Sequence, residues 1–280
     1  MPGCPTFRLA VGCAAVVLRA SVAVGQPVLL QIRPQVGDTF RVRLDQRVEM
    51  SGTTRLGKVD STMSVTTTLF VLTRAIVEAR DQTGTLMLAT TDSVLLWTDG
   101  ADSTSAAAEA RRALHGKRVR LHVAPDGSTE VVSGDGYVSP ELRTLFAQMP
   151  ATLPREEVTV GSKWLRVMAI PMTKESADRG GGTLKATFRF DSLSRNGEWA
   201  YLSMSGTLTR SPAAATERQG TTLAMSGSVL GSMIVDRRRG WITDARATFT
   251  VRSLMTPPTG STARPLRFRM KVTQWMRAVQ

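Results

Sequence analysis

The sequence contains only two cysteines, Cys4 and Cys13, among its 280 residues. Both lie in an N-terminal stretch that we interpret below as a secretory signal, so the mature chain would have none. A protein without disulfides must be held together by its hydrophobic core. The lack of cysteine also excludes thiolate catalysis and cysteine-ligated metal sites from the mature chain.

Histidine is equally scarce, because only His115 and His122 are present. Two histidines in different predicted elements do not form a metal signature. The sequence also lacks a Gly-x-Ser-x-Gly nucleophile motif, a Gly-x4-Gly-Lys-Ser/Thr phosphate loop and an Asp-x-Asp-x-Asp-Gly calcium loop. We therefore expect no catalytic residue, no cofactor and no metal site, and we expect that the protein is not an enzyme.

The apolar run at the N-terminus is too short for a transmembrane helix, which needs about 20 apolar residues. It covers ten residues, Leu9–Leu18, after the basic Arg8, and the small residues Ala23-Val24-Gly25 follow. This order is typical of a secretory signal over residues 1–25, with cleavage before Gln26. Cleavage before Cys13 with lipid anchoring there is the alternative. The sequence thus predicts an exported protein, periplasmic or extracellular, with peripheral attachment to the outer membrane as one option.

Charge of one sign dominates: the formal net charge is +13, and 30 of the 36 basic residues are arginines. An excess of positive charge favours anionic partners such as a membrane surface. No nucleic-acid recognition module is visible, and we expect no nucleic-acid partner. The densest basic cluster is Arg237-Arg238-Arg239, which is a candidate contact for an anionic surface. The alternative is an exposed hairpin tip whose charge serves solubility.

Alternation of apolar and polar residues runs through most of the chain and predicts β-strands. The first strand covers Phe40–Met50, and Ser51-Gly52-Thr53-Thr54 predicts a turn after it. Further predicted strands cover residues 59–78, 85–97, 118–123, 129–133, 164–172, 184–191, 199–208, 223–235, 242–254 and 266–277. Arg195-Asn196-Gly197-Glu198 and Pro125-Asp126-Gly127 are typical hairpin turns.

Two segments predict helices instead. The alanine-rich stretch at residues 103–115 has hydroxyl residues at its start and Gly116 at its end. The second begins at Ser139-Pro140-Glu141, places apolar residues at helical spacing up to Met149, and ends at Pro150.

The predicted strands carry apolar residues on one face and basic residues on the other. The basic set is Arg41, Arg43, Arg47, Arg118, Arg120, Lys185, Arg189, Arg246, Arg252, Arg267, Arg269 and Lys271. An antiparallel sheet can expose one face to water. The predicted fold is therefore mainly β (α+β): a large curved antiparallel sheet or half-barrel, with two short helices covering its apolar face.

Two similar segments suggest two similar halves. Val36-Gly37-Asp38-Thr39-Phe40 and Val160-Gly161-Ser162-Lys163-Trp164 both read Val-Gly, two polar residues and an aromatic. We expect a first β half with both helices over residues 26–152 and a second β half over residues 153–280, and we expect the two halves to form one compact unit.

These paired openings, together with the Leu153-Pro154 passage before the second one, resemble a bacterial family of secreted proteins that carry a domain of unknown function. That resemblance implies no catalytic residues. More distantly, the plan looks like periplasmic lipoprotein carriers, whose curved sheet has an apolar concave face covered by helices. This second likeness concerns the fold and is weak support for a function.

The sequence favours a non-enzymatic exported envelope protein that binds a lipid-like or other apolar ligand, or a membrane surface. The ligand-binding residues are unknown at this stage. The alternative is a structural or interaction module whose sheet face is filled by its own helices and loops. Several polar residues converging inside one apolar pocket would instead favour an enzyme.

Overall fold

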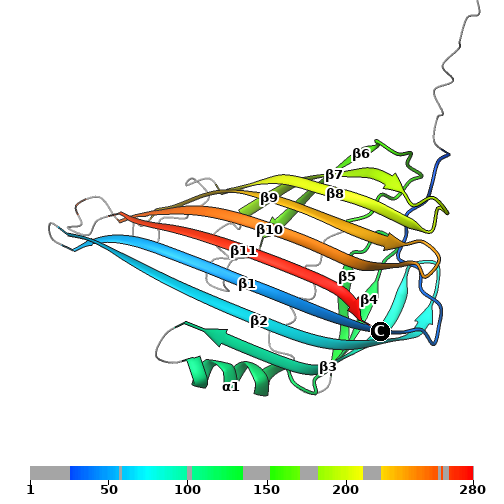
Figure 1. Ribbon diagram of the computed structural model, residues 1–280, viewed down its shortest axis with the longest axis horizontal. Coiled ribbons are helices and arrows are strands. Elements are labelled where there is room, and N and C mark those ends of the chain that lie inside the picture. The colour runs from blue at the N-terminus through cyan, green and yellow to red at the C-terminus, as the bar shows by residue number, and fades with distance from the viewer. Residues whose placement is uncertain are drawn as a thin grey trace, which may run out of the picture.

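A computed structural model (Figure 1) describes residues 26–56, 59–99, 103–134, 152–170, 182–210, 222–257, 260 and 265–279. The predicted signal at residues 1–25 and the second predicted helix at residues 139–149 lie outside the described residues.

The described chain contains eleven strands and one helix. The first half consists of β1 (Thr39–Leu56), β2 (Val59–Arg80), β3 (Thr85–Thr98), α1 (Ser103–Leu114), β4 (Arg118–Val123) and β5 (Thr129–Gly134). The second half consists of β6 (Lys163–Ile170), β7 (Gly182–Leu193), β8 (Trp199–Arg210), β9 (Thr222–Asp236), β10 (Trp241–Thr256) and β11 (Leu266–Val279).

All eleven strands form one sheet in the order β5-β4-β3-β2-β1-β11-β10-β9-β8-β7-β6, and every neighbouring pair is antiparallel. The first and last strands of the chain, β1 and β11, therefore lie side by side in the middle of the sheet. The sheet curves strongly but is not closed (Figure 1). The predicted fold class, a large curved antiparallel sheet, is confirmed.

The turn predicted at Ser51–Thr54 is wrong, because β1 continues through it to Leu56. Ser51 and Gly52 pair with β2 on one side and with β11 on the other. A Cβ atom added at Gly52 would lie 3.1 Å from the Phe268 ring, which is tighter than most Cβ contacts. The glycine thus leaves room for an aromatic side chain on the neighbouring strand, and it does not bend the chain.

The two Val-Gly segments adopt the same turn. Gly37 has φ +90° and Gly161 has φ +94°, the left-handed region that favours glycine. The amide of Gly37 donates to the Val77 carbonyl at 3.0 Å, and the amide of Gly161 donates to the Phe190 carbonyl at 2.7 Å. Similarity between the two halves as a whole stays a prediction.

Helix α1 agrees with the first predicted helix and is followed by Gly116 at φ +72°. Its main contacts are with β3, beside which it lies in Figure 1. Most of its described side chains are exposed. The helix therefore supports one margin of the sheet.

One end of the half-barrel is closed by chain segments that cross it; we call this the closed end. Three backbone contacts hold the N-terminal segment there. Val28 forms a β-bridge with Val158, the Ile32 amide donates to the Pro125 carbonyl, and the Arg33 amide donates to the Gly240 carbonyl. Leu30 is consequently fully buried.

Asp126 holds the same end together from the β4–β5 turn. Its carboxylate accepts hydrogen bonds from the Ser128 hydroxyl at 2.7 Å, the Ser128 amide at 3.1 Å and Arg155 Nε at 3.0 Å. Burial raises the pKa of Asp126, but the hydrogen bonds from Ser128 and Arg155 outweigh burial, so its pKa lies below the ordinary value. Its backbone carbonyl accepts from Thr152 and Leu153, which places the fully buried Leu153 in the core.

Candidate functional site

The inner face of the sheet is apolar over most strands, because alternate side chains of each strand point to the same side. The pairing register brings Val48 of β1, Val272 of β11 and Phe249 of β10 into one row across the sheet. Val229 of β9 continues that row. This face is the candidate ligand-binding surface.

One part of the inner face is densely packed. We call the inner side chains of β7, β8 and β9 the packed wall. Phe188 and Phe190 are fully buried, and Leu202 and Val229 are each 1% exposed. Trp164 of β6 stacks on Phe188 with the ring centroids 5.9 Å apart. The packed wall belongs to the same core as Leu30 and Leu153, and burial of its apolar side chains stabilises the fold.

The middle of the inner face is packed less tightly. We call the inner side chains of β2, β1 and β11 the half-exposed wall. Its apolar members are only partly buried, and they are Leu69 and Val71 of β2, Leu44 and Val48 of β1, and Val272 and Met276 of β11. Farther from the closed end, Met50 is 41% exposed and Met63 is 62% exposed. This wall offers apolar surface to a ligand.

Two glutamines interrupt the half-exposed wall at the same place. Gln46 of β1 and Gln274 of β11 are directly paired in the register, so their side chains share the inner face. Both are partly buried. Each amide provides two donors and an acceptor oxygen. A few polar groups within an apolar surface are typical of ligand sites, where they orient the ligand. The sequence showed Gln46 as a break in the apolar row, but only the strand register brings Gln274 beside it.

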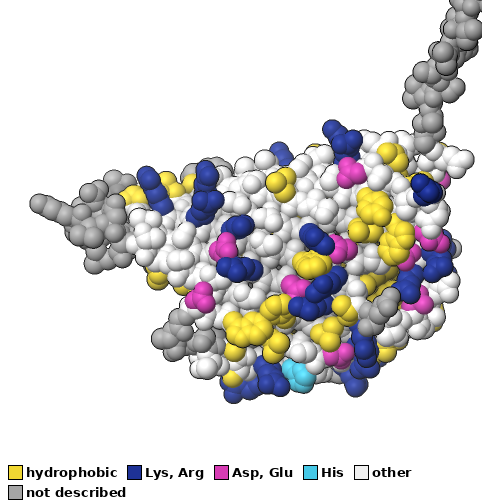
Figure 2. Space-filling model, viewed as in Figure 1, with side chains coloured by type: hydrophobic (Ala, Val, Ile, Leu, Met, Phe, Trp, Pro, Cys, Tyr) yellow, Lys and Arg dark blue, Asp and Glu magenta, His cyan; other side chains and the backbone are white. Residues whose placement is uncertain are grey.

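The outer face carries the predicted basic residues. The register and the exposure of these side chains place all twelve of them on the face opposite the core. Acidic residues on the same face balance many of them, as in Arg120–Glu78 at 2.8 Å, Arg43–Asp45 at 2.7 Å and Arg47–Glu49 at 2.8 Å. Figure 2 shows basic, acidic and hydrophobic side chains intermixed over the visible surface.

Trp275, on the outer face of β11, contacts two arginines and one aspartate. The guanidinium carbons of Arg246 and Arg277 lie 4.3 Å and 4.1 Å from the centroid of the Trp275 ring, at cation–π distance. The Trp275 indole donates to Asp244 at 2.7 Å. Asp244 also pairs with Arg246 at 3.3 Å. These arginines are therefore engaged within the protein.

The predicted anionic-surface contact, Arg237-Arg238-Arg239, forms the turn between β9 and β10 at the closed end. All three side chains are exposed. The backbone amides of Arg238 and Arg239 donate to the buried Asp236 carboxylate, and the Arg237 guanidinium donates to the Gly197 carbonyl. Arg237 also lines a small groove of about 170 Å³ with Leu29 and Arg33. Contact with an anionic surface stays a prediction, with Arg238 and Arg239 the freer side chains.

Within the described ranges, no group of three or more His, Cys, Asp and Glu side chains is placed to hold a metal ion. In the same part of the chain, no helix has the length and apolar character needed to cross a membrane.

A family of unknown function, DUF6263, matches residues 134–242. No curated protein matches the chain. Among solved structures, the chain is similar to one titled "Lipid-protein interactions in lipovitellin", with 9% identity and a TM-score of 0.45, over 89% of this chain and 26% of that chain. It is also similar to the outer membrane protein OprG from Pseudomonas aeruginosa, with 6% identity and a TM-score of 0.21, over 88% of this chain and 98% of that chain. The chain thus spans about a quarter of the lipovitellin chain.

Proposed function

We propose that this protein is a non-enzymatic, exported protein of the bacterial envelope that binds a lipid-like or other apolar ligand on the half-exposed wall. The observation that carries the proposal is the partial burial of six aliphatic and thioether side chains on the inner face of β2, β1 and β11. Covering apolar surface stabilises a complex by roughly 25 cal/mol per Å². A ligand laid along these strands would cover side chains that the chain itself leaves partly exposed.

The paired Gln46 and Gln274 suit the polar end of such a ligand. Their amides are neutral and can both donate and accept, which fits an ester, amide or hydroxyl group. A buried carboxylate or phosphate would instead need a compensating charge nearby. The ligand class that follows is an uncharged or weakly polar amphiphile with an extended apolar part.

The test is native mass spectrometry of the mature protein, purified from the envelope fraction without detergent. We expect a reproducible additional mass that extraction with organic solvent removes. A measured protein mass equal to that of a chain starting at Gln26 would also establish cleavage of the secretory signal. Protein that carries no additional mass, and that takes up no added fatty alcohol or monoacylglycerol, would contradict ligand binding.

A matched pair of variants locates the ligand. Val272 and Thr273 are neighbours on β11 whose side chains point to opposite faces, and both are changed to glutamate. Val272→Glu places a charge on the half-exposed wall and should abolish the additional mass. Thr273→Glu places the same charge on the outer face, opposite Arg47, and should retain it. The milder Val272→Thr, which keeps the side-chain volume, should weaken retention if Val272→Glu does not fold.

A second candidate is the structural or interaction module. The burial of Phe188, Phe190, Leu202 and Val229 in the packed wall favours it, because these side chains offer almost no apolar surface to a ligand. In this case the mature protein would carry no additional mass, and Val272→Glu and Thr273→Glu would differ only in stability.

A further inference from the structure

We infer that a separate site on the outer face binds a phosphate group, either free or as part of a lipid headgroup, between Arg252 and Arg269. An open groove of about 580 Å³ lies here, at the end of the sheet far from the closed end. Its lining includes both arginines together with Ser51 and Ser226. The site is distinct from the half-exposed wall, and it does not depend on the proposed inner ligand.

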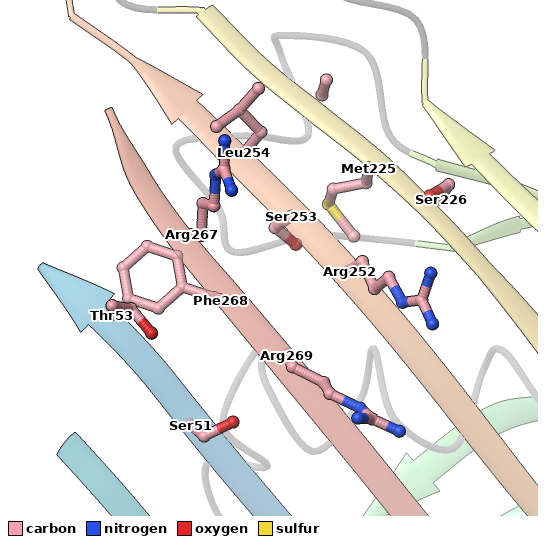
Figure 3. A pocket seen from close by; sticks show the side chains of 11 residues that line it. Ser51, Thr53, Met225, Ser226, Arg252, Ser253, Leu254, Arg267, Phe268 and Arg269 are labelled. Atoms are coloured by element: carbon pink, nitrogen blue, oxygen red, sulfur yellow. The ribbon is translucent and has the colours of Figure 1, made fainter. Parts of the chain in front are cut away.

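The strand register builds the site. Arg269 of β11 lies directly opposite Arg252 of β10, Ser51 of β1 is the other neighbour of Arg269, and Ser226 of β9 is the other neighbour of Arg252. One row across four strands therefore reads serine, arginine, arginine, serine. In Figure 3 the guanidinium groups of Arg252 and Arg269 extend in the same direction, whereas Arg267 extends toward Leu254.

The arginine pair is electrostatically unusual for this surface. Like charges directly opposite each other on neighbouring strands are destabilising. Arg43 and Arg277 are also directly opposite, but Asp45 pairs with both of them, at 2.7 Å and 3.6 Å, and relieves the repulsion. Among the described residues, no carboxylate forms an ion pair with Arg252 or Arg269. An anion bound between the two guanidinium groups would supply the missing charge.

Phosphate fits these groups in chemistry and in spacing. The guanidinium group is planar and binds phosphate oxygens through two parallel N–H donors. Side chains directly opposite in an antiparallel pair have Cβ atoms about 5 Å apart, so two long arginines can converge on one tetrahedral anion. The hydroxyls of Ser51 and Ser226 stand at the two ends of the row as further donors. Both arginines are exposed, so a soluble anion or a membrane surface can reach them.

The experiment compares two double variants of the full mature protein. Arg252→Gln with Arg269→Gln removes two charges from the proposed site. Lys185→Gln with Arg189→Gln removes two charges from the outer face of β7 and serves as the control. The probes are pyrophosphate, followed by calorimetry, and vesicles of phosphatidylcholine containing phosphatidylglycerol, followed by flotation. Each is measured at low and high salt, because an electrostatic interaction between exposed groups weakens with ionic strength.

We expect the Arg252/Arg269 double variant to weaken binding of at least one probe by tenfold or more, while the control variant binds as the wild type does. Binding of pyrophosphate would assign the site to a soluble phosphate, and binding of vesicles alone would assign it to a lipid headgroup. Equal losses in both double variants would show a general charge effect and overturn the site, as would failure of the wild type to bind either probe. Loss of the inner ligand in Val272→Glu leaves this outcome unaffected, so the two proposals can fail separately.

Discussion

The packed wall and the half-exposed wall are built from strands with the same alternation, yet they are buried to different extents. In the packed wall Phe188 and Leu202 are 0% and 1% exposed, whereas Val48 and Val272 of the half-exposed wall are only partly buried. The difference follows from what lies over each wall. Leu30 and Leu153, on segments that cross the closed end, join the same core cluster as Phe188 and Leu202. Burial in this protein is therefore decided by the crossing segments more than by strand composition.

From this contrast we propose different roles for the two walls. Close-packed interiors are sensitive to the loss of single methylene groups, so the packed wall should govern stability. Apolar side chains that are only partly buried contribute less to folding and remain available for binding. The four predictions below test this division, from the largest expected effect on stability to the smallest.

The largest effect is expected in the packed wall. Phe188→Ala should lower the free energy of unfolding by about 3–5 kcal/mol, because it leaves a cavity among fully buried neighbours. Two valines of one register row give the matched comparison: Val229→Ala in the packed wall should cost about 2 kcal/mol, because Val229 is 1% exposed. Val272→Ala in the half-exposed wall should cost about 1 kcal/mol, because its methyl groups are only partly removed from water. Urea unfolding of both valine variants measures the difference, and similar losses would mean that the walls are packed alike.

The second largest loss of stability is expected where the N-terminal segment contacts the closed end. Gly240→Ala would place a Cβ atom 2.6 Å from the backbone of Arg33, at a residue with φ +59°. We expect a loss of about 2–3 kcal/mol in the free energy of unfolding, since both strain and displacement of the N-terminal segment contribute. The control is Gly37→Ala, which has φ +90° and no atom within 4 Å of the added Cβ. It should lose about 1 kcal/mol from backbone strain alone, so equal losses would argue against a close fit at Arg33.

Asp126 links the β4–β5 turn to the segment that contains Leu153 and Arg155, and the stabilisation that it provides should depend on pH. Its pKa in the folded protein lies below the ordinary 3.8. A group with a lowered folded pKa stabilises the fold above its unfolded pKa, and this stabilisation is lost as the pH falls through the folded value. Asp126→Asn should therefore cost about 1–3 kcal/mol at neutral pH, where charge-assisted hydrogen bonds are removed. The difference from wild type should shrink toward zero in strong acid, which unfolding measured from pH 7 downward would show. A difference independent of pH would contradict this assignment.

The smallest effect on stability is expected on the half-exposed wall. Replacing both members of a polar pair with apolar residues of similar size is nearly neutral, so Gln46→Leu with Gln274→Leu should change the free energy of unfolding by less than about 0.5 kcal/mol. The same double variant should lower the abundance of the ligand-bound species in native mass spectra. Unaltered ligand retention would show that the two amides do not hold the ligand.

The positions of most strands along the chain could be predicted because one face of the sheet is buried. Where one face of a strand is buried, apolar and polar residues must alternate along the sequence. This alternation is clear in β1, β4, β7 and β11. The hairpin at Arg195–Glu198 was equally predictable, because Gly197 adopts φ +72° and supplies the local geometry. The predicted turn at Ser51–Thr54 was wrong for a physical reason. Glycine is common in turns, but Gly52 makes room for Phe268, which lies on a strand more than 200 residues later in the chain.

The sequence by itself determined the class of fold, the two-faced strands and the lack of the common catalytic motifs, because these depend on local periodicity and on residue types. The tertiary structure alone decided which strands become neighbours, since pairing between β1 and β11 joins residues at opposite ends of the chain. It therefore also decided that Gln46 meets Gln274, that Arg252 faces Arg269, and that one wall is covered while the other stays partly exposed. Such contacts depend on register across the whole sheet, and no local pattern carries that information.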